Sequence, residues 1–112
     1  MQNRIAEHIV SRLSQVIEVS YMYDEQRALP YCVYEIDQVV PRMAKRGPIG
    51  YDATVSIYLA AASERESEEL KGKVMAALQE RVRGFVVVVN AVQPAFADEQ
   101  WLQKIDINVK QL

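Results

Sequence analysis

Apolar residues recur at the spacing of one helix face in two stretches of the chain. In residues 4–18 these positions are Ile5, Ile9, Leu13, Val16 and Ile17. In residues 63–83 they are Leu70, Val74, Leu78 and Val82. The second stretch opens with Ser63 and Glu66, the spacing of a capping box, and Gly84 follows as a residue suited to a left-handed helix end. Two helices are therefore predicted.

Four further stretches have the composition or the alternation of β-strands. They are residues 31–40, 51–60, 85–92 and 101–110. Pro41 and Pro94 are expected to end the first and third strands, because proline lacks the N–H that a ladder needs. Residues 42–50 are expected to form an exposed connection longer than a tight hairpin, mobile until a partner orders it, and residues 19–29 show no regular period.

The predicted order of elements is α-β-β-α-β-β. The apolar and polar positions of residues 51–60 alternate, so the sheet should bury one face only. We expect an α+β fold in which two helices pack on one four-stranded mixed or antiparallel sheet, with residues 1–112 as a single domain. Because a helix connects the second and third strands, these two strands are expected to run in the same direction, although they need not be neighbours in the sheet. The expected core consists of Ile9, Leu13, Leu70, Val74, Leu78, Val55, Ile57, Ile105 and Ile107.

Composition and charge exclude several classes of protein. The formal net charge is −2 and the pI is about 5.4, so no overall positive field favours nucleic acid or anionic lipid. The apolar run of residues 85–89 is far shorter than the roughly 20 residues of a membrane span. We expect no sequence-specific nucleic-acid partner and no membrane partner.

The residues that carry chemistry elsewhere form no convincing site in this sequence. Glu35 and Asp37 share a side of their strand, but a solvated strand face explains them better than acid–base catalysis. His8 is the only histidine and is expected on the surface, and Cys32 is expected to be an inert strand residue, in keeping with a reducing cytoplasm. We therefore predict no catalytic residue, no metal site, no cofactor and no enzymatic activity.

The surface offers candidates for contact with partner proteins. Arg42, Lys45 and Arg46 concentrate positive charge in one predicted connection, although such a tip is often simply solvated. Six tyrosines occur in the first 58 residues, and Tyr21 and Tyr23 lie in the aperiodic segment after the first helix. These five residues are the predicted partner contacts.

Residues 29–36 (LPYCVYEI), residues 51–57 (YDATVSI) and the helix that follows resemble the tail-completion, or tail-terminator, family of tailed phages and prophages. The resemblance extends over the order of elements along the whole chain, but its motifs are mostly packing and turn residues. It implies a non-enzymatic virion subunit that forms a homo-oligomeric ring, a hexamer, which terminates the tail tube and joins it to the head connector. It also implies a place in the bacterial cytoplasm during assembly and in the virion tail afterwards.

Two other kinds of function remain open from the sequence. A ferredoxin-like small-molecule-binding or regulatory module is the main alternative, because a half-open sheet with two helices can present a ligand cleft. A small hydrolase or isomerase ranks below both.

Overall fold

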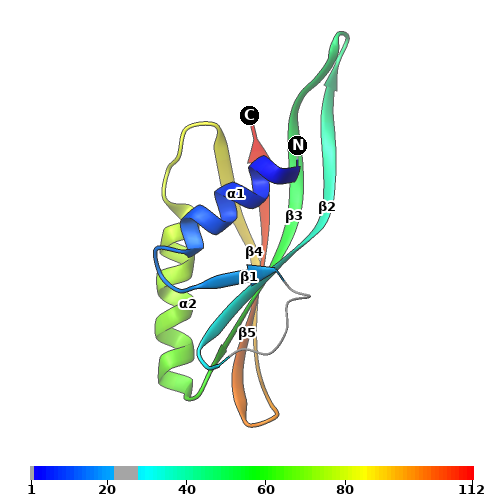
Figure 1. The fold of residues 1–112 in the computed structure, drawn as a ribbon. Helices are drawn as coiled ribbons and strands as arrows, with labels where there is room; N and C mark the ends of the chain where they lie inside the picture. Colours follow the sequence, from blue (N-terminus) through cyan, green and yellow to red (C-terminus); the bar gives the residue numbers. More distant parts are fainter. Residues whose placement is uncertain (1, 22–27) are drawn as a thin grey trace.

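Two helices lie on one face of a mixed sheet in the computed structural model of the chain, which describes residues 2–21 and 28–112 (Figure 1). The elements are α1 (Gln2–Leu13), β1 (Val19–Tyr21), β2 (Tyr31–Ala44), β3 (Gly47–Ala61), α2 (Glu64–Gln79), β4 (Phe85–Ala97) and β5 (Gln100–Gln111). Over these described ranges the sheet has five strands in the order β1-β2-β3-β5-β4. The α+β class with two helices on one sheet is confirmed, whereas the predicted number of four strands is wrong.

The additional strand is β1, which pairs parallel with β2 and makes the sheet mixed. Val19 lies opposite Cys32, and Tyr21 lies opposite Tyr34. Three residues are too few for an alternating pattern to show in the sequence. The resulting order α-β-β-β-α-β-β also differs from the β-α-β-β-α-β order of ferredoxin-like domains.

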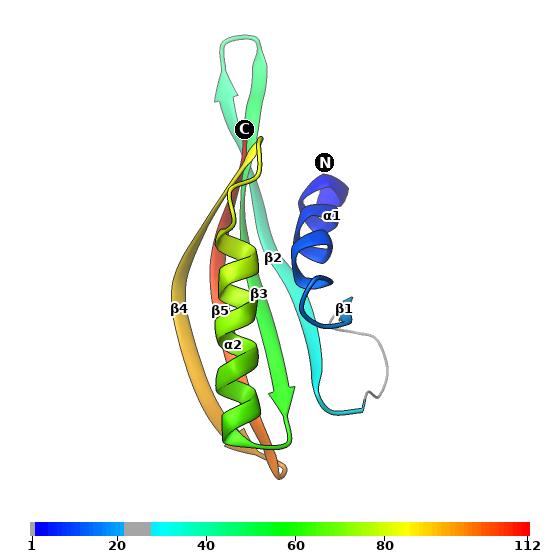
Figure 2. The same cartoon turned by 90° about the vertical axis from the view of Figure 1, so that its left-hand side faces the viewer.

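β5 lies inside the sheet, between β3 and β4. This strand pairs antiparallel with β3 on one side and with β4 on the other, so β3 and β4 run in the same direction without being neighbours. α2 connects them and lies along the sheet beside β3 and β5, while α1 covers the part near β2 (Figure 2). The predicted common direction of these two strands is confirmed.

The core lies between the helices and one face of the sheet. The predicted residues Ile9, Leu13, Val74, Leu78, Val55, Ile57, Ile105 and Ile107 are all buried, with at most 1% of their surface exposed. Leu70 is only partly buried and packs against the edge of this cluster. Burial of such side chains contributes about 1.5–3 kcal/mol each to the hydrophobic term of folding.

The capping box of α2 is present. Ser63 Oγ accepts a hydrogen bond from the Glu66 N–H at 3.1 Å, and Glu66 Oε1 accepts one from the Ala62 N–H at 3.2 Å. The helix ends at Gln79, earlier than predicted, and Gly84 takes its positive φ of 93° in the turn before β4. α1 likewise ends at Leu13, because the chain turns there toward β1.

Both prolines that were expected to end strands lie inside strands. Pro41 belongs to β2 at a point where β3 is its only neighbour, since β1 pairs with residues 32–34 alone. Pro94 belongs to β4, which is the outer strand of the sheet. A missing N–H is tolerated at an edge because no second strand needs it there.

Residues 42–50 form a two-stranded hairpin, which we call the arm, and the prediction of a connection longer than a tight hairpin is wrong. β2 continues to Ala44 and β3 starts at Gly47, whose φ of 121° a side chain would disfavour. Pairing between β3 and β5 begins only at Tyr51, so the arm extends beyond the rest of the sheet (Figure 1). The molecule measures 52 × 27 × 21 Å along its principal axes.

Candidate protein interface

The arm exposes large apolar side chains. Met43 and Ile49 are 63% and 64% exposed, and Val40 at the base of the arm is 46% exposed. A two-stranded hairpin without a covered face is only marginally stable in water. Exposed apolar residues on a projecting hairpin therefore favour contact with another protein surface.

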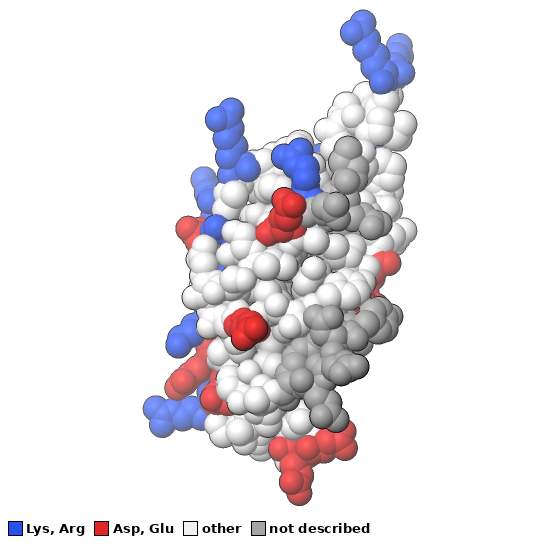
Figure 3. All heavy atoms as spheres, viewed as in Figure 1, with Lys and Arg blue, Asp and Glu red and all other residues white. Residues whose placement is uncertain are grey.

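Two of the predicted basic contacts occupy the tip of the arm. Lys45 and Arg46 form the turn between β2 and β3, and both are exposed. Figure 3 shows basic side chains at the end of the arm and acidic side chains at the opposite end of the molecule. The tip of the arm is therefore locally basic, although the formal net charge of the chain is −2.

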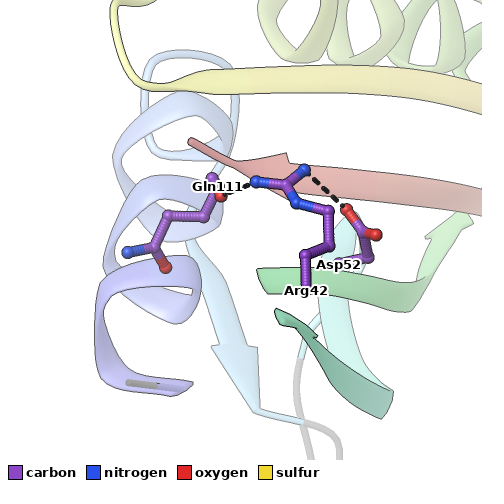
Figure 4. Close-up of polar contacts among 3 residues, drawn as sticks. All are labelled: Arg42, Asp52 and Gln111. Atoms are coloured by element: carbon purple, nitrogen blue, oxygen red, sulfur yellow. Dashed lines mark hydrogen bonds and ion pairs between the residues drawn. The ribbon is translucent and has the colours of Figure 1, made fainter. Parts of the chain in front are cut away.

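Arg42, the third predicted basic contact, is held inside the base of the arm. Its guanidinium donates from Nη1 to Asp52 Oδ1 at 3.2 Å and from Nη2 to the main-chain oxygen of Gln111 at 2.7 Å (Figure 4). These contacts connect β2 with β3 and with the end of β5. Arg42 therefore braces the arm against the sheet instead of adding charge to the tip.

Gly50 makes room for this brace. It lies opposite Arg42 in the ladder, and a Cβ at this position would meet the Arg42 guanidinium and approach the Gln111 main-chain oxygen to 2.5 Å. Since the oxygen belongs to the backbone, a larger residue would have to shift the end of β5. The sequence signal for this role, a glycine eight residues after an arginine, is too common to be specific.

The predicted tyrosine contacts have different outcomes. Tyr21 is 40% exposed on β1 and packs edge-on against Tyr34, with ring centroids 5.3 Å apart. Tyr23 lies outside the described residues. Tyr21 is therefore placed at the margin of the sheet, far from the arm tip in the pairing order.

The face of the sheet that neither helix covers is polar at its centre, and we call it the open face. Two carboxylate oxygens lie within hydrogen-bond distance of Ser56 Oγ, namely Asp37 Oδ2 at 2.7 Å and Asp106 Oδ1 at 3.3 Å. The hydroxyl has one proton, so it donates to one of them at a time. Lys104 Nζ lies 3.8 Å from Asp106 Oδ1. Asp37 therefore belongs to a hydrogen-bonded network on the open face, and Glu35 is not joined to it by any described contact.

The open face is hollowed on both sides of this polar centre. Toward the arm the hollow is lined by Val40, Asp52, Thr54, Val86, Val88 and Lys110. Toward the other end it is lined by Tyr31, Val33, Tyr58, Pro94, Leu102 and Lys104. Val86 and Val88 are 45% and 52% exposed, so apolar surface of the open face also remains available to a partner.

His8 is buried, and its predicted place on the surface is wrong. The residue is only 8% exposed. Its ring stacks on that of Phe85, with centroids 4.1 Å apart and planes 2° from parallel. Burial, assisted by the charge of Arg12, lowers the pKa of His8 below its usual 6.5. The burial of His8 was not predicted because this residue lies at the edge of the apolar stripe, three residues after Ile5 and one before Ile9.

Cys32 is fully buried in the core, as a small strand residue would be. Burial raises the pKa of its thiol to about 12, which leaves it protonated and unreactive at neutral pH. Among the residues that the structure describes, no three histidine, cysteine, aspartate or glutamate side chains gather into a possible metal site. Within the same residues, no helix is long and apolar enough to cross a bilayer.

Comparison with known proteins supports the fold and leaves the family undetermined. No protein-family model and no curated protein matches the sequence. A crystal structure of a protein from Akkermansia muciniphila is similar, with a TM-score of 0.53 and 12% sequence identity over 97% of this chain. The match covers 48% of that protein, so this chain spans about half of its length. A likeness at this identity concerns the fold alone.

Proposed function

We propose that this chain is a non-enzymatic structural subunit of a phage or prophage tail. In this role it forms a ring that terminates the tail tube and joins it to the head connector. The sequence resemblance to tail-terminator proteins in residues 29–36 and 51–57 motivates the proposal. The observation that carries it is the arm, a braced projection with exposed Met43 and Ile49.

The arrangement of the surfaces supports an assembly role. The arm extends past the sheet at one end, and the open face adds apolar surface at Val86 and Val88. A ring requires one patch of a subunit to meet a different patch of the next, and this chain offers two such distinct surfaces. Binding energy in protein interfaces comes chiefly from a few apolar anchors, which the exposed side chains of the arm provide.

The proposal can be tested in a bacterium that carries the coding sequence in an inducible prophage. Deletion should yield heads and tails that fail to join, with irregular tail ends in electron micrographs, and the wild-type gene should restore joined virions. The double variant Met43→Ser/Ile49→Ser should fail to complement, whereas Arg65→Ser, at a side chain that is 90% exposed on α2, should complement fully. Normal virions in the deletion strain would refute the proposal.

One observation favours a second candidate, a small-molecule-binding module. The hollow beside Tyr31 and Tyr58 combines apolar walls with one cation, and Lys104 Nζ lies 5.9 Å from the centre of the Tyr58 ring. A small anionic aromatic ligand suits these groups. Thermal stabilisation by such compounds, lost in Lys104→Ala but retained in Arg65→Ser, would favour this function over the tail role.

A further inference from the structure

The two ends of the long axis carry opposite charges in their hairpin turns. Lys45 and Arg46 form the turn of the arm, and Asp98 and Glu99 form the turn between β4 and β5. All four residues are exposed. The register of β3 and β5 places the two turns beyond opposite ends of the sheet, since Tyr51 pairs with Gln111 near the arm and Ala61 pairs with Trp101 near the other turn (Figure 1).

Each charged turn adjoins an exposed apolar side chain. Met43 and Ile49 flank the basic turn, as described for the arm. Phe96, two residues before Asp98, is 58% exposed and its ring contacts that of Trp101 in a tilted arrangement, with centroids 4.7 Å apart and planes at 48°. Both ends of the molecule therefore combine apolar contact area with charge, and the two charges are complementary.

We propose that the arm of one copy docks on the β4–β5 turn of a second copy. In this contact Lys45 and Arg46 face Asp98 and Glu99, and the apolar side chains of the arm cover Phe96. The two patches cannot meet within one chain, because they lie at opposite ends of a molecule that is 52 Å long. A second copy is the partner that presents both the matching charge and the matching apolar group.

The apolar side chains and the charges of this contact have different roles, because they differ in how much they contribute to affinity. Exposed ion pairs contribute little affinity, so Met43, Ile49 and Phe96 supply the apolar contact. The charges determine which end meets which, because a tip facing another basic tip would be repelled. Different patches meet in this contact, so it repeats head to tail and closes into a ring when the rotation between copies allows. The inference rests on the proposed function only in taking self-association as its premise.

The test is a charge exchange between two variants of the full chain. The arm variant is Lys45→Glu/Arg46→Glu. The turn variant is Asp98→Asn/Glu99→Lys, in which Asn is chosen because position 98 has a positive φ of 52° and asparagine tolerates that region. Circular dichroism and melting temperature should show that both variants fold as the wild type does.

Sedimentation velocity at low salt and high protein concentration measures the association. We expect the wild type to associate more weakly as salt increases, and each variant alone to associate at least about tenfold more weakly than the wild type. An equimolar mixture of the two variants should regain association, because each acidic arm then meets a basic turn. The Met43→Ser variant should associate weakly at every salt concentration.

The inference is overturned if the wild type stays monomeric at all concentrations, if either variant associates as the wild type does, or if the mixture fails to recover. It is also overturned if the arm variant loses binding to tail tubes while self-association is unchanged, since the occupant is then a tail protein. These results are distinct from those of the prophage deletion. Recovery in the mixture together with normal virions in the deletion strain would leave the contact standing and refute the tail function.

Discussion

Replacement of Arg42 tests whether this residue stabilises the fold or only adds positive charge to the tip of the arm. The change is Arg42→Ser, and the matched control is Lys45→Ser/Arg46→Ser, which removes neighbouring positive charge from the same hairpin. The structure gives Arg42 two anchoring hydrogen bonds, to Asp52 and to the Gln111 main-chain oxygen. From the sequence alone, all three basic residues were expected to lie in an exposed connection as candidate partner contacts.

The expected loss of stability can be worked out from the two contacts. The hydrogen bond to Gln111 is charge-assisted and short, at 2.7 Å, and such bonds contribute about 1.5–3 kcal/mol when well buried. The side chains of Arg42 and Asp52 are 25% and 46% exposed, so water partly replaces the lost partners and the ion pair adds at most about 1 kcal/mol. We therefore expect Arg42→Ser to cost about 1–2 kcal/mol, or roughly 3–10 °C in melting temperature. The control should stay within about 0.5 kcal/mol of the wild type.

Urea unfolding followed by the fluorescence of Trp101 and by circular dichroism measures both variants. Gly50→Ala offers an independent check, because it should disturb the same brace by pressing on the Gln111 main-chain oxygen. Equal stability of Arg42→Ser and the wild type would refute the reasoning. So would a loss in the control as large as that in Arg42→Ser, since the stabilisation would then belong to the tip.

Two further predictions concern the core and the buried histidine. Leu78→Ala should lower the free energy of unfolding by about 2–5 kcal/mol, because Leu78 is fully buried and its truncation leaves a cavity; a loss under about 0.5 kcal/mol in urea would contradict the packing of α2. His8 has a pKa lowered below 6.5 in the folded state, so the unfolded state binds more protons and stability should fall as the pH drops below about 6.5. His8→Phe, which keeps an aromatic ring on Phe85, should flatten this dependence, and identical pH profiles of unfolding for the variant and the wild type would count against it.

The predictions of local structure were most accurate where a local sequence pattern and the tertiary structure favour the same conformation. The capping box of Ser63 and Glu66 starts α2 as expected, and the alternation of residues 51–60 identifies the buried face of β3. Both signals depend on near neighbours in the chain. Their physical causes, N–H groups that need acceptors and side chains that alternate in direction, act within a single element.

The sequence predicted poorly where the outcome depends on which strands are neighbours. Pro41 and Pro94 break a strand only if a second strand needs their missing N–H, and both lie at edges that a single sequence does not reveal. The role of Arg42 also depends on Gln111, which is 69 residues away in the chain. The sequence therefore placed Lys45 and Arg46 at an exposed tip, but it did not predict the arm that carries them.

The position of β5 has a consequence for how the chain folds during synthesis. β5 is made after β4, yet it lies between β3 and β4 and supplies the pairing partner of both. Until residues 100–111 have left the ribosome, these two strands each have an unpaired edge, and their apolar residues have no completed core. Long-range pairing of this kind slows folding and leaves nascent chains open to aggregation. Cooperative folding of this sheet therefore has to wait for β5, which is made after both of the strands that it joins.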